Sequence, residues 1–366
     1  MLEKIKNKYC KPIRKKGEVM RMKLFGILSV ILSVNLALFA VDFEKKGDFR
    51  VRTQWENDGN SSRFRERIRL RYSVTGEIDD LWKIGFGVAT GGSDPRSTNE
   101  TLDNSFETPD LRLDHAFAEA KVLNGLEIWF GKYKGIKKAI CCLSGLLWDS
   151  DLRPEGLGIK WVKEYNNKNL FFNTGMWIID EIKKGDDPYL VYFQPGFDFV
   201  KSDNVELQMY VGCYLFGNVK GKALDHSPGT NTLSSGNLKY DYDVFSPGMR
   251  IMFDNSSKFT LSLFVEGVVN IDIDKSNKGY LLGVGVSNDN GWKLEISHGR
   301  LERDAWLDIF SDSDEFNGQT GTQGQKINIS KKVNKHTSVR ADYIHLEDLI
   351  TNDNLNVCKL DMLWSF

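Results

Sequence analysis

The sequence predicts an all-β fold, a transmembrane antiparallel β-barrel of about sixteen strands with short turns at one end and long loops at the other. Three observations predict it. After residue 47, β-branched or aromatic residues occupy alternate positions in segments of about ten residues. The connections between these segments alternate between short and long, and the last segment carries an alternating apolar stripe that ends at Phe366. This combination is typical of barrels that cross an outer membrane.

The composition of the 366-residue chain agrees with that fold and excludes several others. Hydrophobic residues make up 41% and aromatic residues 12%, and the net charge is −1, so the chain is not of the weakly hydrophobic, highly charged type that stays disordered. The 33 Gly and 8 Pro show no triplet period and no heptad run is present, which excludes collagen and coiled coils. Because the chain is not basic, no nucleic-acid partner is expected.

The N-terminal segment differs in charge from the rest of the chain. Of 49 basic and 50 acidic residues, nine and two lie in 1–40, so 41–366 holds 40 and 48, a net charge of −8. A basic start, an apolar run and a small residue at its end predict a secretory signal peptide over 22–40. A retained N-terminal anchor is the alternative. Residues 1–21 are interpreted as an upstream extension, and 41–366 as a single barrel domain.

Sixteen segments are predicted to be strands, because each alternates with the period of two that a pleated strand imposes. They span 48–56, 63–75, 81–91, 111–122, 126–134, 156–164, 169–179, 189–200, 204–216, 243–254, 258–269, 279–288, 291–304, 323–333, 336–347 and 355–366.

The connections predict the topology. If the first strand starts on the side that holds the N-terminus, every second connection is a short turn and the others are mostly long. The long ones span 92–110, 135–155, 217–242 and 305–322. Short periplasmic turns and long extracellular loops are the topology of outer-membrane barrels, whereas a soluble sandwich has no reason to sort its loops. We therefore expect the cell outer membrane as the location, with both termini periplasmic.

Aromatic residues near the strand ends predict two belts at the membrane surfaces, where amphipathic rings meet lipid headgroups. The alternative is a set of scattered core aromatics. The predicted belts consist of Trp82, Phe253, Phe259, Trp292 and Trp364 beside the short turns, and Trp177 and Tyr280 at the opposite strand ends.

The last strand predicts how the chain is inserted. Its apolar face, which contains Trp364 and Phe366, is expected to contact outer-membrane lipid, and its polar face to contact water. A chain that ends in Phe after alternating apolar residues resembles the assembly signal of Gram-negative outer-membrane proteins. That resemblance implies the barrel assembly machinery as a partner and Trp364 and Phe366 as signal residues.

A ladder of arginines predicts a polar lumen. Arginine occupies every second position along the second strand, and two more arginines lie in the first strand. On a lipid-facing surface each would cost about 2 to 4 kcal/mol near the midplane, so we expect them to line a pore and to select ions. The alternative is an ordinary water-facing strand. This arginine ladder consists of Arg50, Arg52, Arg63, Arg65, Arg67, Arg69 and Arg71.

The third long loop combines an apolar run with carboxylates. Residues 139–148, which end in Trp148, would be costly to expose in an outer loop. Folding of this loop into the barrel would bury the run and place Asp149, Asp151 and Glu155 opposite the arginine ladder. We therefore predict a constriction loop with these four named residues and a transverse electric field.

Three motifs resemble one known family. They are "RFRERIRLRY" at 63–72, "GVATGGSDPRSTNETL" at 87–102 and "LLWDSDLRPEG" at 146–156. These motifs are similar to the putative porin family of outer-membrane proteins, most densely over 60–165 and in the last strand. The resemblance implies a sixteen-stranded barrel, diffusion-channel activity and assembly as a homotrimer, but it supplies no particular solute.

The expected function is an outer-membrane porin, a water-filled channel for passive diffusion of small hydrophilic solutes and ions through an Arg-lined constriction. The alternative is a non-conducting barrel that acts through its loops as an adhesin or structural anchor. The strand number discriminates, because about eight strands would be filled by side chains whereas sixteen leave a channel. No enzyme and no cofactor are expected, since the five His are scattered and HExxH, GxSxG and phosphate-loop motifs are absent.

The remaining polar features predict no metal site, because Cys and His lack metal-ligand spacing. The adjacent Cys141 and Cys142 would bond only through a strained ring, so free thiols or a redox-labile pair are expected. The acidic clusters 185–187 and 312–315 are interpreted as solvated charge in outer loops, with Ca²⁺ or Mg²⁺ that bridges lipopolysaccharide as the alternative. Weak anion selectivity is expected, because the ladder lies closer to the ion than screened loop acids do.

Overall fold

The computed structural model describes residues 43–366 except 104, 167, 203, 256 and 257. They form one antiparallel sheet of seventeen strands that closes on itself, and a separate two-stranded piece. One strand of the sheet, β4, has only two residues, so sixteen long strands make the barrel wall. The predicted fold class is confirmed.

The long strands are β1 (Phe43–Asn57), β2 (Ser62–Glu77), β3 (Trp82–Thr90), β5 (Leu111–Leu123), β6 (Leu126–Lys132), β7 (Glu155–Tyr165), β8 (Lys168–Ile178), β9 (Tyr189–Ser202), β10 (Val205–Gly217), β13 (Asp243–Asn255), β14 (Phe259–Asn270), β15 (Lys278–Asn288), β16 (Trp292–Leu301), β17 (Thr322–Lys332), β18 (Thr337–Asp348) and β19 (Asn354–Ser365). The short elements are β4 (Glu100–Thr101), helix α2 (Ile136–Ala139), β11 (Leu233–Ser234), β12 (Asn237–Leu238) and the 3-10 helix η1 (Asp308–Phe310). Neither helix of the described part of the chain is long and apolar enough to cross a membrane.

Strands β1 and β19 close the barrel by antiparallel pairing along the seam, and β1 pairs with β2 on its other side. Side chains alternate between the two faces of the wall, as the pleat requires. On β19, Leu360 and Met362 are exposed whereas Lys359 and Asp361 are buried. The strand therefore has an apolar outer face and a charged inner face.

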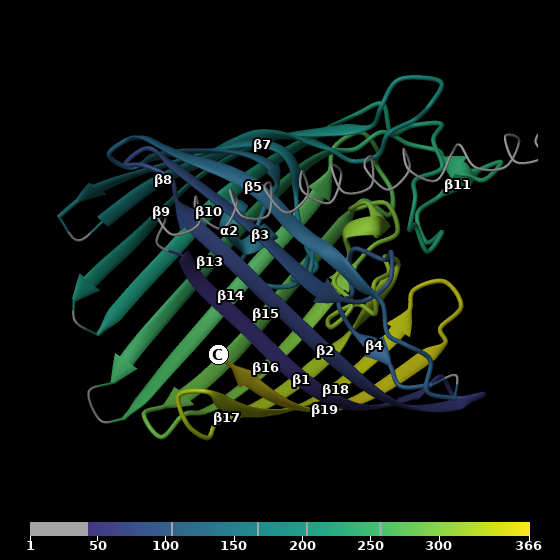
Figure 1. Cartoon of the computed structure of the whole chain (residues 1–366). Helices are drawn as coiled ribbons and strands as arrows, with labels where there is room; N and C mark the ends of the chain where they lie inside the picture. The colour runs from purple at the N-terminus through teal and green to yellow at the C-terminus, as the bar shows by residue number, and fades with distance from the viewer. Residues whose placement is uncertain (1–42, 104, 167, 203, 256–257) are drawn as a thin grey trace, which may run out of the picture.

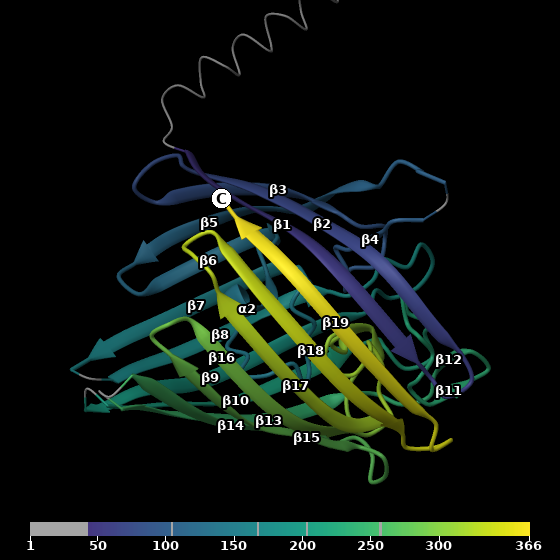
Figure 2. The ribbon, with the colours of Figure 1, turned by 90° about the horizontal axis from the view of Figure 1, so that it is seen from below.

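The two ends of the barrel differ, as Figures 1 and 2 show. Short turns gather at one end, on the left in both views, and the C-terminus lies toward the same end. We call it the short-turn end, and the opposite end the loop end. Two loops from the loop end matter for the site: loop 3, residues 133–154, which contains α2, and loop 7, residues 302–321, which contains η1.

An aromatic cluster fills one side of the lumen. Trp148 of loop 3 lies 4.9 Å from Trp306 of loop 7 and 5.6 Å from Tyr214 of β10, measured between ring centroids. The apolar run that seemed too costly for an outer loop is buried here, since Leu146 and Leu147 are at most 1% exposed. The cluster comprises Trp129, Tyr133, Trp148, Trp177, Tyr192, Tyr214, Phe216, Trp306 and Phe310.

Two expectations about particular residues are wrong. Trp177 is 4% exposed and packs in the aromatic cluster, so it belongs to no outer belt; its position in β8 has the inward parity. The acidic run 312–315 is not solvated outer-loop charge, because loop 7 folds inward and leaves Asp312 only 7% exposed. The predicted leader, 22–40, and the extension, 1–21, lie outside the described residues.

Candidate functional site

The arginine ladder lies on the inner face of β1 and β2. The antiparallel register sets Arg50 beside Arg69 and Arg52 beside Arg67. Arg50, Arg52 and Arg69 are at most 7% exposed, whereas Phe64, Leu70 and Tyr72 of β2 are exposed on the outer surface. Arg63, near the loop end of β2, is exposed. The structure therefore brings the central arginines together inside the barrel.

Carboxylates neutralise much of the ladder, and they include residues of the wall and of loop 7 as well as the loop 3 carboxylates that were expected to face it. The wall supplies some of them: Asp48 lies two residues before Arg50 and therefore shares its face, and Asp361 lies opposite Arg52 across the seam. The ion pairs are Arg52 with Asp361 at 2.6 Å and with Asp314 at 3.2 Å, Arg65 with Glu56, Arg69 with Asp48 at 2.7 Å, and Arg71 with Asp48 at 2.8 Å and with Asp151 at 3.2 Å.

Arg50 is less well compensated than its neighbours. Its Nη1 lies 3.6 Å from Asp361, whose two oxygens already accept hydrogen bonds from Arg52 at 2.6 and 2.8 Å. Its Nη2 donates to the side chain of Asn99, and its buried Nε has no hydrogen-bond partner within the described part of the chain. Arg50 thus retains a free donor in the lumen.

The four predicted residues of the constriction loop have four different environments. Asp151 accepts hydrogen bonds from Arg71 at 3.2 Å and from the hydroxyl of Thr98 at 2.8 Å. The carboxylate of Asp149 accepts hydrogen bonds from the backbone N–H groups of Asp151 and Ser313. Trp148 is buried in the aromatic cluster and stabilises the loop by packing. Glu155 lies on β7, not on the loop, where it pairs with Lys132.

Loop 7 completes the constriction together with loop 3. The N–H of Asp149 donates to the carbonyl of Phe310 at 2.9 Å, and the N–H of Ser313 donates to the Asp149 carboxylate at 2.8 Å. The approach is close at Gly145, where a Cβ would overlap Cγ of Glu315 and lie 3.0 Å from an oxygen of Asp312. A side chain at this position would therefore displace these two side chains of loop 7.

The loop carboxyls differ in pKa because burial and neighbouring charges affect each of them differently. Burial raises the pKa of Asp312 to about 7, and the neighbouring Asp314 and Glu315 add to the effect. Burial, Asp312 and Asp151 likewise raise the pKa of Asp149. The pKa of Asp151 is lowered despite its burial, because Arg71, Arg69 and Arg153 stabilise its charge.

Asp314 shows the opposite balance to its neighbour Asp312. Burial acts to raise its pKa, but Lys359 and Arg52 hold that pKa well below its usual range. Its carboxylate accepts hydrogen bonds from Lys359 at 2.6 Å and from Arg52 at 3.2 Å. Asp314 therefore links loop 7 to both strands of the seam.

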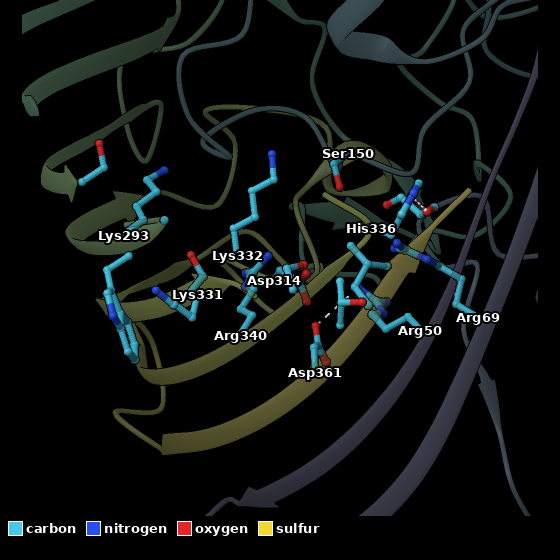
Figure 3. A pocket seen from close by; sticks show the side chains of 18 of the residues that line it. Arg50, Arg69, Ser150, Lys293, Asp314, Lys331, Lys332, His336, Arg340 and Asp361 are labelled. Carbon is cyan, nitrogen blue, oxygen red and sulfur yellow. Dashed lines mark hydrogen bonds and ion pairs between the residues drawn. The ribbon is translucent and has the colours of Figure 1, made fainter. Parts of the chain in front are cut away.

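Several cavities adjoin these residues. A cavity of about 700 Å³ is lined by Arg50, Arg69, Asp149 and Asp312 and extends to the short turn after β17. Figure 3 shows its basic and acidic side chains around one space. A second cavity, of about 620 Å³, is lined by residues of β1, loop 3 and the C-terminus.

Sequence reasoning missed Asp312 and Asp314, and also Arg153 and Asp114. Arg153 donates to Asp114 at 2.7 Å and lines three of the cavities. Arg153 stands in the same family-like motif as Asp149, so the motif was the available signal. No signal indicated that loop 7 would fold inward.

The predicted assembly residues lie at the seam. The N–H of Phe366 donates to the carbonyl of Gly47 at 2.9 Å, and the Phe366 side chain is 61% exposed. Trp364 stacks on Phe49 with ring centroids 5.7 Å apart. Within the described residues, no group of three or more His, Cys, Asp or Glu is placed to hold a metal ion, and Cys141 and Cys142 are free thiols.

Solved structures of similar fold include an outer membrane protein and porins. They include a loop-deletion mutant of OmpT, an outer membrane protein of Vibrio cholerae (13% identity, 89% of this chain and 100% of that chain, TM-score 0.54), and Salmonella typhi OmpF in complex with daunomycin (11%, 88% and 97%, 0.54). A mutant of Rh. blastica porin matches with 12% identity over 89% and 100% and a TM-score of 0.51. These similarities show the shared barrel fold.

A search of curated proteins gives no match. The family model described as "Putative porin" matches residues 41–252, which is more than half of the chain. The match includes β1 and β2 with the arginine ladder, and all of loop 3. The chain therefore belongs to the putative porin family.

Proposed function

We propose that the chain is a passive outer-membrane porin through which small hydrophilic solutes and ions diffuse. The observation that supports this most strongly is a closed sixteen-strand wall with apolar side chains exposed outside and charged side chains inside. A barrel of this strand number encloses more space than its wall side chains fill. We also propose that the short-turn end faces the periplasm, as in other outer-membrane barrels.

The proposed route for water and ions passes between the ladder and the two inward loops. Arg50 and Arg69 lie on one side of this route and Asp149 and Asp312 on the other, and all four line the same cavity. The aromatic cluster occupies the opposite side of the lumen. Because much of the ladder is paired, we propose weak anion selectivity that depends mainly on Arg50 and Arg69.

Planar bilayer recordings of the refolded chain test this proposal. We expect stepwise conductance, and we expect Arg50→Gln combined with Arg69→Gln to move the reversal potential in a KCl gradient toward that of cations. Arg63→Gln is the matched control, because Arg63 is exposed near the loop end. Absence of conductance steps would contradict the porin function. Steps with an unchanged reversal potential would contradict only the role of Arg50 and Arg69.

The proposed partners are outer-membrane lipid, lipopolysaccharide, the barrel assembly machinery and two further copies of the chain. The homotrimer rests on the family resemblance. Chemical cross-linking of the protein in native outer membranes tests it, and a product of monomer mass alone would contradict it.

A further inference from the structure

The two cavities described above adjoin at the short-turn end. They share Ser150, His336 and Ser365 as lining residues. We call the combined space the vestibule. Its parts, of about 700 and about 620 Å³, are each within the range of small-molecule binding sites.

The vestibule is positively charged in a chain that is otherwise acidic. Seven cationic and five carboxylate side chains line the first cavity, and six cationic and two carboxylate side chains line the second, with none in common. The side chains of the vestibule therefore carry a formal net charge of +6 with His neutral, whereas those of 41–366 as a whole carry −8. Such a concentration of one sign raises the local concentration of ions of the opposite sign.

Five of the seven carboxylates of the vestibule already pair with arginines, Asp151 with Arg71 among them, and Asp149 and Asp312 accept hydrogen bonds from backbone N–H groups. Asp361 and Asp314 accept hydrogen bonds from Arg52, and Asp48 accepts them from Arg69 and Arg71. Asp114 accepts from Arg153. These groups therefore neutralise arginines of the wall and of loop 3, and not the lysines at the short-turn end.

Four lysines of the vestibule have no such partner. Lys137 and Lys138 are the last-turn residues of α2, and Lys332 and Lys335 flank the short turn between β17 and β18. All four are exposed, and their ammonium groups form no hydrogen bond or ion pair within the part of the chain that the structure describes. In Figure 3 the side chain of Lys332 extends into the first cavity, and Arg50 and Arg69 lie on another side of that cavity.

We propose that the vestibule binds small anions that carry two or more negative charges, such as multicarboxylates and phosphates. The free lysines supply mobile point charges, and Arg50, which is 7% exposed, supplies an unpartnered buried donor. A multivalent anion contacts several of these cations at once, whereas a monovalent anion is displaced by salt. The proposal rests on the porin function, because the bound anion would occupy the proposed permeation route.

The experiment measures block of KCl conductance by citrate and by pyrophosphate, with gluconate as the monovalent comparison. In the native protein we expect both multivalent anions to block from the short-turn side at concentrations at least tenfold below gluconate. Lys332→Gln combined with Lys335→Gln, and separately Lys137→Gln combined with Lys138→Gln, should each raise the half-blocking concentration severalfold. Lys163→Gln, an exposed lysine of β7 that lines neither cavity, should leave it unchanged.

The outcomes separate this proposal from the porin function. Equal block by citrate, pyrophosphate and gluconate would overturn it. It would also be overturned if Lys163→Gln raised the half-blocking concentration as much as the vestibule variants do. Block by only one of the two multivalent anions would identify carboxylate or phosphate as the preferred chemistry. If the chain does not conduct, equilibrium dialysis of the folded barrel with the same anions decides the proposal independently, and retention no greater than that of gluconate overturns it.

Discussion

Asp312 offers a direct test of the contact between loops 3 and 7. It is 7% exposed and its pKa is raised from 3.8 to about 7, by burial and then by Asp314 and Glu315. Because the folded pKa is above the unfolded value, the folded state binds the extra proton between these two pKa values. Stability is therefore greatest at low pH, falls as the pH rises from 3.8 to about 7, and changes little above that.

The magnitude follows from the shift. Each pKa unit corresponds to about 1.4 kcal/mol, so the ionised Asp312 lowers the stability of the fold by up to about 4 kcal/mol. At pH 5 this loss of stability is about 1.6 kcal/mol, so the stability should fall by about a further 3 kcal/mol between pH 5 and pH 8.5. Two further ionisable groups face Asp312: the carboxyl of Asp149 in loop 3, which has the same sign, and the ammonium group of Lys326 in β17, which has the opposite sign.

Asp312→Asn isolates this group. The amide oxygen still accepts from the N–H groups of Asp314 and Glu315, which lie 2.7 and 2.9 Å from the carboxylate, but it cannot ionise. We expect the free energy of unfolding of the variant, relative to that of the native protein, to rise by about 3 kcal/mol between pH 5 and pH 8.5. Urea unfolding followed by tryptophan fluorescence measures this difference. A difference that is constant with pH, or that favours the native protein at high pH, would refute the reasoning.

Four further predictions concern the seam, the loop contact and the export of the chain. Asp314→Asn removes the ionic partner of buried Lys359, so the free energy of unfolding should fall by about 1 to 3 kcal/mol in urea titrations at pH 7. Gly145→Ala should push loop 3 away from Glu315 and Asp312 and loosen the constriction, so single-channel recording should show noisier current; unchanged current noise would argue against the contact. Phe366→Asp should lower the amount of heat-modifiable barrel in the outer membrane without blocking export, and normal levels would count against the assembly signal. N-terminal sequencing of the mature protein should find Val41 or a residue close to it, and an intact leader would exclude the predicted cleavage.

The strand pattern was predictable because alternation is a local property of the sequence. The predicted strand 126–134 and the observed β6 start at the same residue, and the alternating stripe of β19 is exposed as its parity requires. The first strand was predicted to begin at residue 48 but begins at Phe43, because its early residues are charged and carry no apolar alternation. The barrel fold and the inward direction of the arginine ladder could therefore be predicted from the sequence alone.

Contacts between distant segments were not predictable in the same way. Arg52 and Asp361 are separated by 309 residues, and only the closure of the barrel places them side by side. Loop 7 was interpreted as solvated because its acidic run resembles an ordinary surface loop. The interpretation failed because Arg52 and Lys359 of the seam provide the positive charge that makes the inward, half-buried position of Asp314 favourable.

The double link of Asp314 to β1 and β19 has a consequence for the order of folding. Arg52 comes from the first strand and Lys359 from the last, so the complete binding place for Asp314 does not exist until the two ends of the chain have met. Loop 7 also packs through Trp306 in the aromatic cluster, but its ionic anchor at Asp314 is complete only in a finished barrel. In a partly inserted intermediate, loop 7 would lack this anchor, and the last contact of the constriction would form only when the seam closes.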